Sequence, residues 1–166
     1  MFFTPRFQAG YLIFTLLLFC GVARLTGAGW RHVAGALASV LVFTAIAPSL
    51  DDFAVRHGWW RFPSCGNLPH PPLAIYLGQS LEFVGCLAFI GWRIQRRFGA
   101  RGIAWLLGIV CVLGPARDFG AAAVLPEVIR FGPQPASWLA DTAAWAVVVL
   151  VALGVSRVVS GRGAGP

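Results

Sequence analysis

Residues 72–92 read PLAIYLGQSLEFVGCLAFIGW, and this stretch decides the fold. At a rise of 1.5 Å per residue, a helix of about 20 residues is long enough to cross the hydrocarbon core of a bilayer. Glu82, near the middle, is its only charged residue. A carboxyl group at that depth costs roughly 2.5 to 3.5 kcal/mol on insertion scales, so it normally faces a bundle interior or a cavity. The stretch therefore predicts a membrane helix that carries a functional acid.

The composition places the whole chain in a membrane. Hydrophobic residues make up 58% and charged residues 11% of the sequence, and the mean hydropathy is +0.75. A soluble protein could not leave so much apolar surface in water. The net charge of +7 comes from arginines at the ends of apolar segments, where membrane orientation and anionic lipids explain them. We expect an all-α integral membrane protein with one domain over residues 1–166 and no nucleic-acid partner.

Apolar segments define about five transmembrane helices. They run over Ala9–Val22, Val33–Ser49, Pro72–Trp92, Ile103–Val124 and Pro135–Val155.

The arginines predict the orientation of these helices. They gather after the first, third and fifth segments, at Arg24, Arg31, Arg93, Arg96, Arg97, Arg101, Arg157 and Arg162. Positively charged loops remain on the cytoplasmic side, so the N-terminus is expected outside and the C-terminus inside. The expected location is the inner membrane of a bacterial cell.

Acidic residues lie on the outer side or within the membrane in this orientation. The candidate catalytic residues are Glu82, Asp141, Asp51, Asp52 and Asp118. For the acids near the loops, a simple balance of the charges on neighbouring arginines is the alternative explanation.

A weak internal repeat of two helices supports a shared site. Residues 47–53, APSLDDF, are echoed by residues 114–119, GPARDF, with a slip of one residue. Each copy continues with Arg-Phe, two prolines and an embedded acid, which is Glu82 in the first copy and Asp141 in the second. Both copies begin on a helix in which the chain is expected to run from the cytoplasmic to the outer side. They would therefore be parallel repeats, related by an axis along the membrane normal. This arrangement predicts that Glu82 and Asp141 face one cleft.

The embedded helices place aromatic and polar side chains beside these acids. Tyr76, Gln79 and Glu82 recur at helical spacing, and Trp138 and Trp145 flank Asp141. A buried acid among aromatic rings can remain a proton donor, and ring faces stabilise a carbocation. An interfacial belt of tryptophans is the alternative. The candidate substrate-binding residues are Trp59, Trp60, Arg61, Phe62, Tyr76, Gln79, Trp138 and Trp145.

Part of the chain resembles a known family. Asp51 or Asp52, the pattern Gly58-x-Trp60-x-Phe62, a proline-rich turn and Leu81-Glu82-Phe83 are similar to the small integral-membrane lycopene cyclases of carotenoid biosynthesis, with their carotenoid-hydratase and terpene-cyclase relatives. The resemblance covers residues 48–89. It implies cyclisation, isomerisation or hydration of an isoprenoid without redox chemistry. It also implies that Glu82 is the catalytic acid, with Asp51 or Asp52 as its counterpart.

Other chemistry has less support in the sequence. The cysteines form no C-x-x-C pair, and His57 and His70 beside the outer acids have no diagnostic metal-ligand spacing. We predict no cofactor and no metal. The expected partners are a lipophilic substrate from the bilayer, membrane lipids and other copies or subunits in an oligomer. The alternative functions are a small proton-coupled transporter of lipophilic compounds that uses Glu82, and a non-catalytic membrane subunit.

The predicted orientation can be tested at Cys65, which lies in the loop expected outside. In a variant that keeps only this cysteine, Cys65 should react with a membrane-impermeant thiol reagent added to intact cells. Labelling that requires access to the cytoplasm would reverse the orientation.

Overall fold

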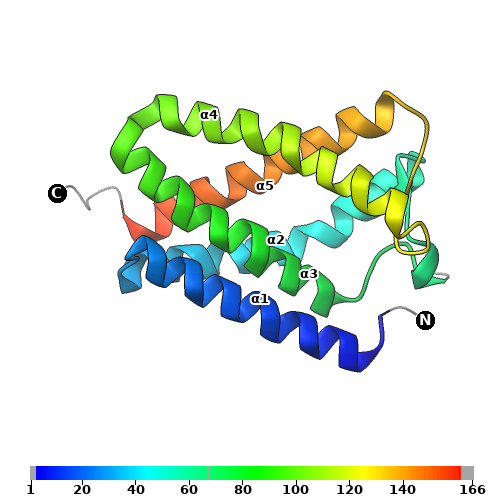
Figure 1. The fold of residues 1–166 in the computed structure, drawn as a ribbon, viewed down its shortest axis with the longest axis horizontal. Helices are drawn as coiled ribbons and strands as arrows, with labels where there is room; N and C mark the ends of the chain where they lie inside the picture. The colour runs from blue at the N-terminus through cyan, green and yellow to red at the C-terminus, as the bar shows by residue number, and fades with distance from the viewer. Residues whose placement is uncertain (1–2, 67, 162–166) are drawn as a thin grey trace.

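The computed structural model describes residues 3–66 and 68–161, which fold into a mainly helical bundle (Figure 1). Within these residues, four helices are long and apolar enough to cross a membrane. They span Pro5–Thr26, Trp30–Arg56, Leu73–Val124 and Ala136–Ser160. The expectation of apolar transmembrane helices is therefore met, although five separate helices are not confirmed.

Helices α1 and α2 form an N-terminal pair with clear boundary signals. Helix α1 (Pro5–Thr26) begins after Thr4, whose side chain accepts a hydrogen bond of 3.2 Å from the backbone N–H of Phe7. It ends at Gly27, whose φ of 65° is the left-handed conformation that glycine adopts without strain. Helix α2 (Trp30–Arg56) follows at once. Both helices extend several residues beyond the apolar segments, and for α1 the Thr4 and Gly27 caps set the ends.

The next helical stretch is continuous but doubles back on itself. It comprises α3 (Leu73–Gln79), the π-helical turn η2 (Ser80–Gly85) and α4 (Cys86–Val124). Gly99 interrupts α4 with a φ of 61° and a ψ of −148°, and Figure 1 shows the chain reversing its direction along α4. The segments Pro72–Trp92 and Ile103–Val124 therefore form two antiparallel arms of one bent element.

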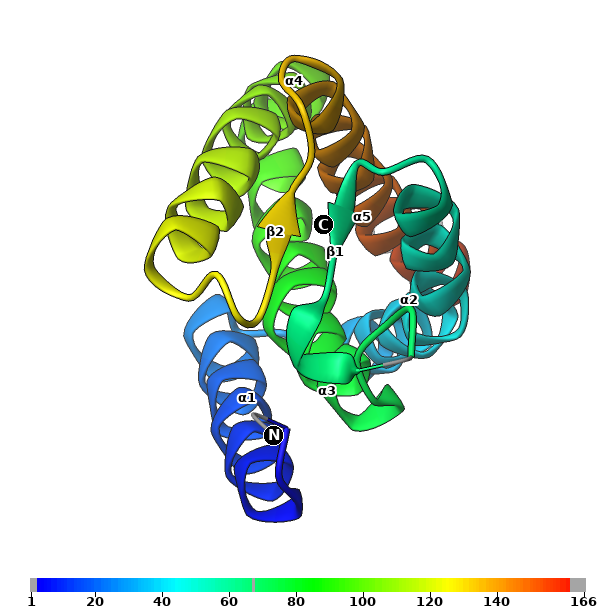
Figure 2. The ribbon, with the colours of Figure 1, turned by 90° about the vertical axis from the view of Figure 1, so that its right-hand side faces the viewer.

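Two short strands join the connections at one end of the bundle. Strand β1 (Trp60–Arg61) pairs antiparallel with β2 (Arg130–Phe131), and Arg61 lies opposite Arg130. The 3-10 turn η1 (Pro63–Cys65) follows β1, and α5 (Ala136–Ser160) follows β2. In Figure 2 the strands cross the end of the bundle that faces the viewer.

The strand pairing relates the two copies of the sequence repeat. Arg61 and Arg130 occupy matching places in the copies, and an antiparallel pair that joins equivalent residues has a local twofold axis. Each copy also begins on a helix with an internal proline three residues before an aspartate, Pro48 before Asp51 and Pro115 before Asp118. This local twofold relation is what parallel repeats about a common axis would produce.

The core forms where α5 packs against α2 and α4. Close approach of α2 and α5 depends on small residues, because a Cβ on Gly35 would lie 2.7 Å from the carbonyl oxygen of Ser156. The hydroxyl of Ser39 also donates across this interface to the carbonyl of Ala152 at 3.2 Å. Helix α1 lies to one side of the other helices (Figure 2) and packs against α3, η2 and α4.

The α2–α5 contact predicts a strong effect of one methyl group. Gly35→Ala should lower the thermal unfolding temperature in detergent, because the backbone of Ser156 cannot move aside, and overpacking typically costs about 1 to 3 kcal/mol. Gly108→Ala is the matched control, since a Cβ at this helical glycine meets nothing within 4 Å. The control should keep or raise the unfolding temperature. Equal stability of the two variants would contradict the proposed close contact.

Candidate functional site

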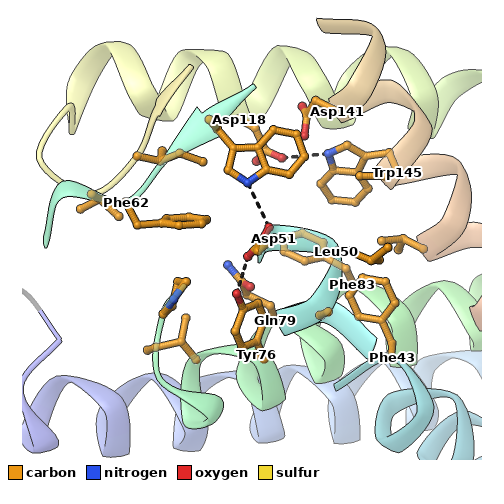
Figure 3. A pocket seen from close by; sticks show the side chains of 18 of the residues that line it. Phe43, Leu50, Asp51, Phe62, Tyr76, Gln79, Phe83, Asp118, Asp141 and Trp145 are labelled. Carbon is orange, nitrogen blue, oxygen red and sulfur yellow. Dashed lines mark hydrogen bonds between the residues drawn. The ribbon is translucent and has the colours of Figure 1, made fainter. Parts of the chain in front are cut away.

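A cavity of about 230 Å³ lies at the strand end of the bundle (Figure 3). Residues of α2, α3, η2, α4 and α5 line it, together with residues of the two connections that carry β1 and β2. Most of its wall is apolar and aromatic. Three carboxyl groups interrupt this surface, those of Asp51, Asp118 and Asp141.

Asp51 is held by two aromatic donors. The indole N–H of Trp60 donates to Oδ1 at 3.0 Å, and the hydroxyl of Tyr76 donates to Oδ2. Both donors are buried. Trp60 comes from β1, Tyr76 from α3 and Asp51 from α2, so these hydrogen bonds join three separate elements. The arrangement fixes the direction of the Asp51 carboxyl and satisfies both of its oxygens.

Asp118 occupies a similar position on the other side of the cavity. Its Oδ2 accepts a hydrogen bond of 2.8 Å from the indole N–H of Trp145, and its Oδ1 pairs with Arg117 at 2.5 Å. The guanidinium carbon of Arg117 lies 4.6 Å from the ring centre of Phe83, which meets Trp145 edge-to-face at 5.0 Å. The indole of Trp145 also lies against Gly114, where a Cβ would be 2.3 Å from the ring. These contacts leave the Trp145 ring little freedom.

Asp141 differs from the other two acids because one of its oxygens has no partner. The residue is 6% exposed, and its Oδ2 makes no hydrogen bond to any described residue. It interacts electrostatically with Asp118, Asp51 and Arg117. A buried polar atom without a partner is uncommon in native proteins and calls for an explanation such as a ligand or a catalytic role. Asp141 is therefore the strongest chemical signal in the cavity.

Glu82 does not line this cavity, although the repeat predicted that it would share a cleft with Asp141. Its Oε2 accepts a hydrogen bond of 2.8 Å from the hydroxyl of Tyr11 in α1. Glu82 and Phe83 are consecutive residues of the π-helical turn η2, so their side chains leave the helix in different directions. Phe83 lines the cavity in its place. The catalytic role of Glu82 stays a prediction.

The structure brings together a large part of the set proposed from sequence. The residues of that set that line the cavity are Asp51, Asp118, Asp141, Trp60, Phe62, Tyr76, Gln79 and Trp145.

The remaining candidates point elsewhere. Trp59 packs against Phe53 and His57, and Trp138 packs against Phe119. Arg61 is exposed on β1. Asp52 is one residue beyond Asp51 on α2, hence about 100° further around the helix, and does not reach the cavity.

Sequence reasoning did not assign Phe83 and Arg117 to the substrate site. Phe83 follows Tyr76 by seven residues, which is the spacing that keeps two side chains on one face of a helix. Arg117 is one of the arginines beside the candidate acids, for which charge balance is the simple explanation. Its position beside Asp118 is visible in the sequence, but its approach to Phe83 depends on the packing of α4 against η2.

The connection between α2 and α3 carries Cys65 and two histidines, His57 and His70. Among the described residues, no three His, Cys, Asp or Glu side chains are grouped closely enough to hold a metal ion. Burial raises the pKa of the Cys65 thiol, so labelling of this residue needs a pH above neutral.

Comparison of the chain with protein-family models, with curated proteins and with solved structures gave no match. The resemblance to lycopene cyclases stays a prediction, and function has to be argued from the site itself.

The hydrogen bond between Trp145 and Asp118 predicts a measurable loss of stability. Trp145→Phe keeps an aromatic ring against Gly114 but removes the donor. Loss of a hydrogen bond to a charged group should lower the free energy of unfolding by about 1.5 to 3 kcal/mol. Trp105→Phe is the control, because Trp105 is 74% exposed. Chemical denaturation in detergent compares the two variants, and equal stability would show that the bond contributes nothing.

Proposed function

We propose that the protein is a membrane-embedded enzyme that performs acid–base chemistry without redox steps on a lipophilic isoprenoid. The observation that carries this proposal is the unpartnered, buried carboxyl oxygen of Asp141 in an aromatic cavity that holds two further carboxyl groups. The three carboxyl groups line one cavity, and Asp141 interacts electrostatically with Asp118 and Asp51, so we assign the role of proton donor to one of the three. Asp141 has the fewest groups to stabilise its ionised form.

The proposed reaction begins with proton transfer from Asp141 to a carbon–carbon double bond or an epoxide oxygen. The π electrons or the breaking C–O bond leave a cationic carbon. Asp118 or Asp51, as a carboxylate, then removes a proton from a neighbouring carbon, which gives an isomer or, after ring closure, a cyclised product. Attack by water on the cationic carbon, followed by loss of a proton from the added water to the same carboxylate, gives a hydrated product. The carboxyl group that received the proton then passes it back to Asp141 before the next turnover.

The surroundings of the acids support this division of roles. Trp60 and Tyr76 donate to Asp51, and Trp145 and Arg117 donate to Asp118, so these two acids have hydrogen-bond donors that Asp141 lacks. The fixed rings of Trp145 and Trp60 offer π faces to a cationic carbon without having to reorganise. The positive charge of Arg117 is offset by its pairing with Asp118.

The proposed placement in the membrane follows from the arginines. We propose that both arms of the α3–α4 element cross the bilayer, which gives five crossings with the N-terminus outside. The arginines at Arg24, Arg31, Arg96, Arg101 and Arg157 lie near the ends of α1 and α5, the start of α2 and the bend at Gly99. These sites share the end opposite the strands in Figure 1, so the cavity would open near the outer face. A substrate dissolved in the bilayer could enter between the helices.

The transport alternative has weaker support. It depends on Glu82 as the group that exchanges protons, but Glu82 lies outside the cavity and is hydrogen-bonded to Tyr11. The acids that line the cavity all lie toward one end of the bundle, whereas alternating access requires the site to face both sides.

The proposal predicts that Asp141→Asn abolishes product formation. The substitution preserves the shape of the side chain but removes the proton donor, and general acid catalysis typically contributes about 10² to 10⁴ in rate. Lipids extracted from an isoprenoid-producing host should contain an isomer or a hydrated product with the wild type and neither with the variant. A well-folded variant that forms product at the wild-type rate would exclude this role.

Two control variants make the test specific. Glu127→Gln changes an exposed acid that does not line the cavity and should retain activity. Glu82→Gln separates the two candidate acids: retention of most activity supports Asp141 as the donor, whereas loss of activity in Glu82→Gln alone would transfer that role to Glu82.

A further inference from the structure

A second cavity, of about 250 Å³, lies near the opposite end of the protein from the acidic cavity. The first arm of α4 and the last turns of α5 line it. Its apolar wall includes Ala88, Trp92 and Leu153, and its polar wall includes Gln95, Ser156 and Ser160. A cavity with an apolar side and a polar side suits a ligand that is itself amphipathic.

Two arginines from different helices give this cavity its charge. Arg96 comes from α4 and Arg157 from α5. No aspartate or glutamate lines the cavity, and the one ion pair in the described part of the chain, Arg117–Asp118, belongs to the other cavity. The guanidinium of Arg96 lies 5.5 Å from the ring centre of Trp92, which limits its position. Neither guanidinium donates a hydrogen bond to a described residue.

We infer that this cavity binds a phosphate group. Guanidinium forks match phosphate oxygens in geometry and charge, and the hydroxyl of Ser156 and the amide of Gln95 supply further donors. The apolar wall would contact the carbon chain of a phospholipid or of another lipid phosphate. A diffuse attraction between a basic surface and anionic lipids requires no cavity and would involve every arginine at this end equally. The inference is independent of the acid–base reaction proposed above.

The experiment measures binding of defined probes to the purified full-length chain in detergent. The probes are dioleoyl phosphatidylglycerol, dioleoyl glycerol as a lipid without phosphate, and inorganic pyrophosphate, and native mass spectrometry records the bound fraction. The wild type should bind phosphatidylglycerol saturably and dioleoyl glycerol at least tenfold more weakly. Displacement of phosphatidylglycerol by pyrophosphate would show that free phosphates also enter, and lack of displacement would assign the site to lipid headgroups.

Two double variants with the same change of charge locate the site. Arg96→Gln/Arg157→Gln should weaken binding of phosphatidylglycerol about 100-fold, at about tenfold for each charge-assisted contact. Arg93→Gln/Arg101→Gln removes two exposed arginines of α4 that do not line the cavity and should change binding less than about threefold. If the first double variant does not fold, the two single variants test the same point.

Three results would overturn the inference. Equal weakening in both double variants would show that only the overall charge of this end attracts lipid. Equal binding of dioleoyl glycerol would show that the phosphate is not recognised. Binding without saturation would show that no defined site exists.

Discussion

Hydrogen bonds from two indole groups to two aspartates are the interactions on which the acidic end of this protein depends. A carboxylate in an apolar bundle is tolerated only when its oxygens have partners. Trp60 reaches Asp51 from β1, and Trp145 reaches Asp118 from α5. Each bond therefore joins elements that are separate in the chain. The pairing of β1 with β2 places Trp60 opposite Phe131, and Trp60 lines the cavity from this position.

The third acid stands apart because the fold leaves it incompletely satisfied. Asp141 is buried, but one carboxyl oxygen has no partner among the described residues. Natural proteins tend to retain such local costs at functional sites, where a ligand or reacting group completes the arrangement. The proposed acid–base chemistry fits this pattern, because a donor must be free to transfer its proton, whereas the groups proposed to accept one, Asp51 and Asp118, are held by hydrogen bonds.

The separation of charge along the molecule gives its two ends different chemistry. Carboxyl groups and ring systems converge at the strand end, while arginines without carboxylate partners line the cavity near the bend and the end of α5. In the proposed orientation, this asymmetry would place proton transfer near one membrane surface and phosphate recognition near the other.

The sequence by itself determined the apolar, helical character of the chain and a set of five candidate acids, of which Asp51, Asp118 and Asp141 line the cavity and Glu82 and Asp52 do not. These features follow from composition and from short-range periodicity, which a single segment carries. Only the tertiary structure decided that Phe83 and not Glu82 faces the cavity, and that Arg96 and Arg157 share a second one. The physical reason is that periodicity fixes which residues share a face of a helix, whereas the direction of that face is set by packing against other helices.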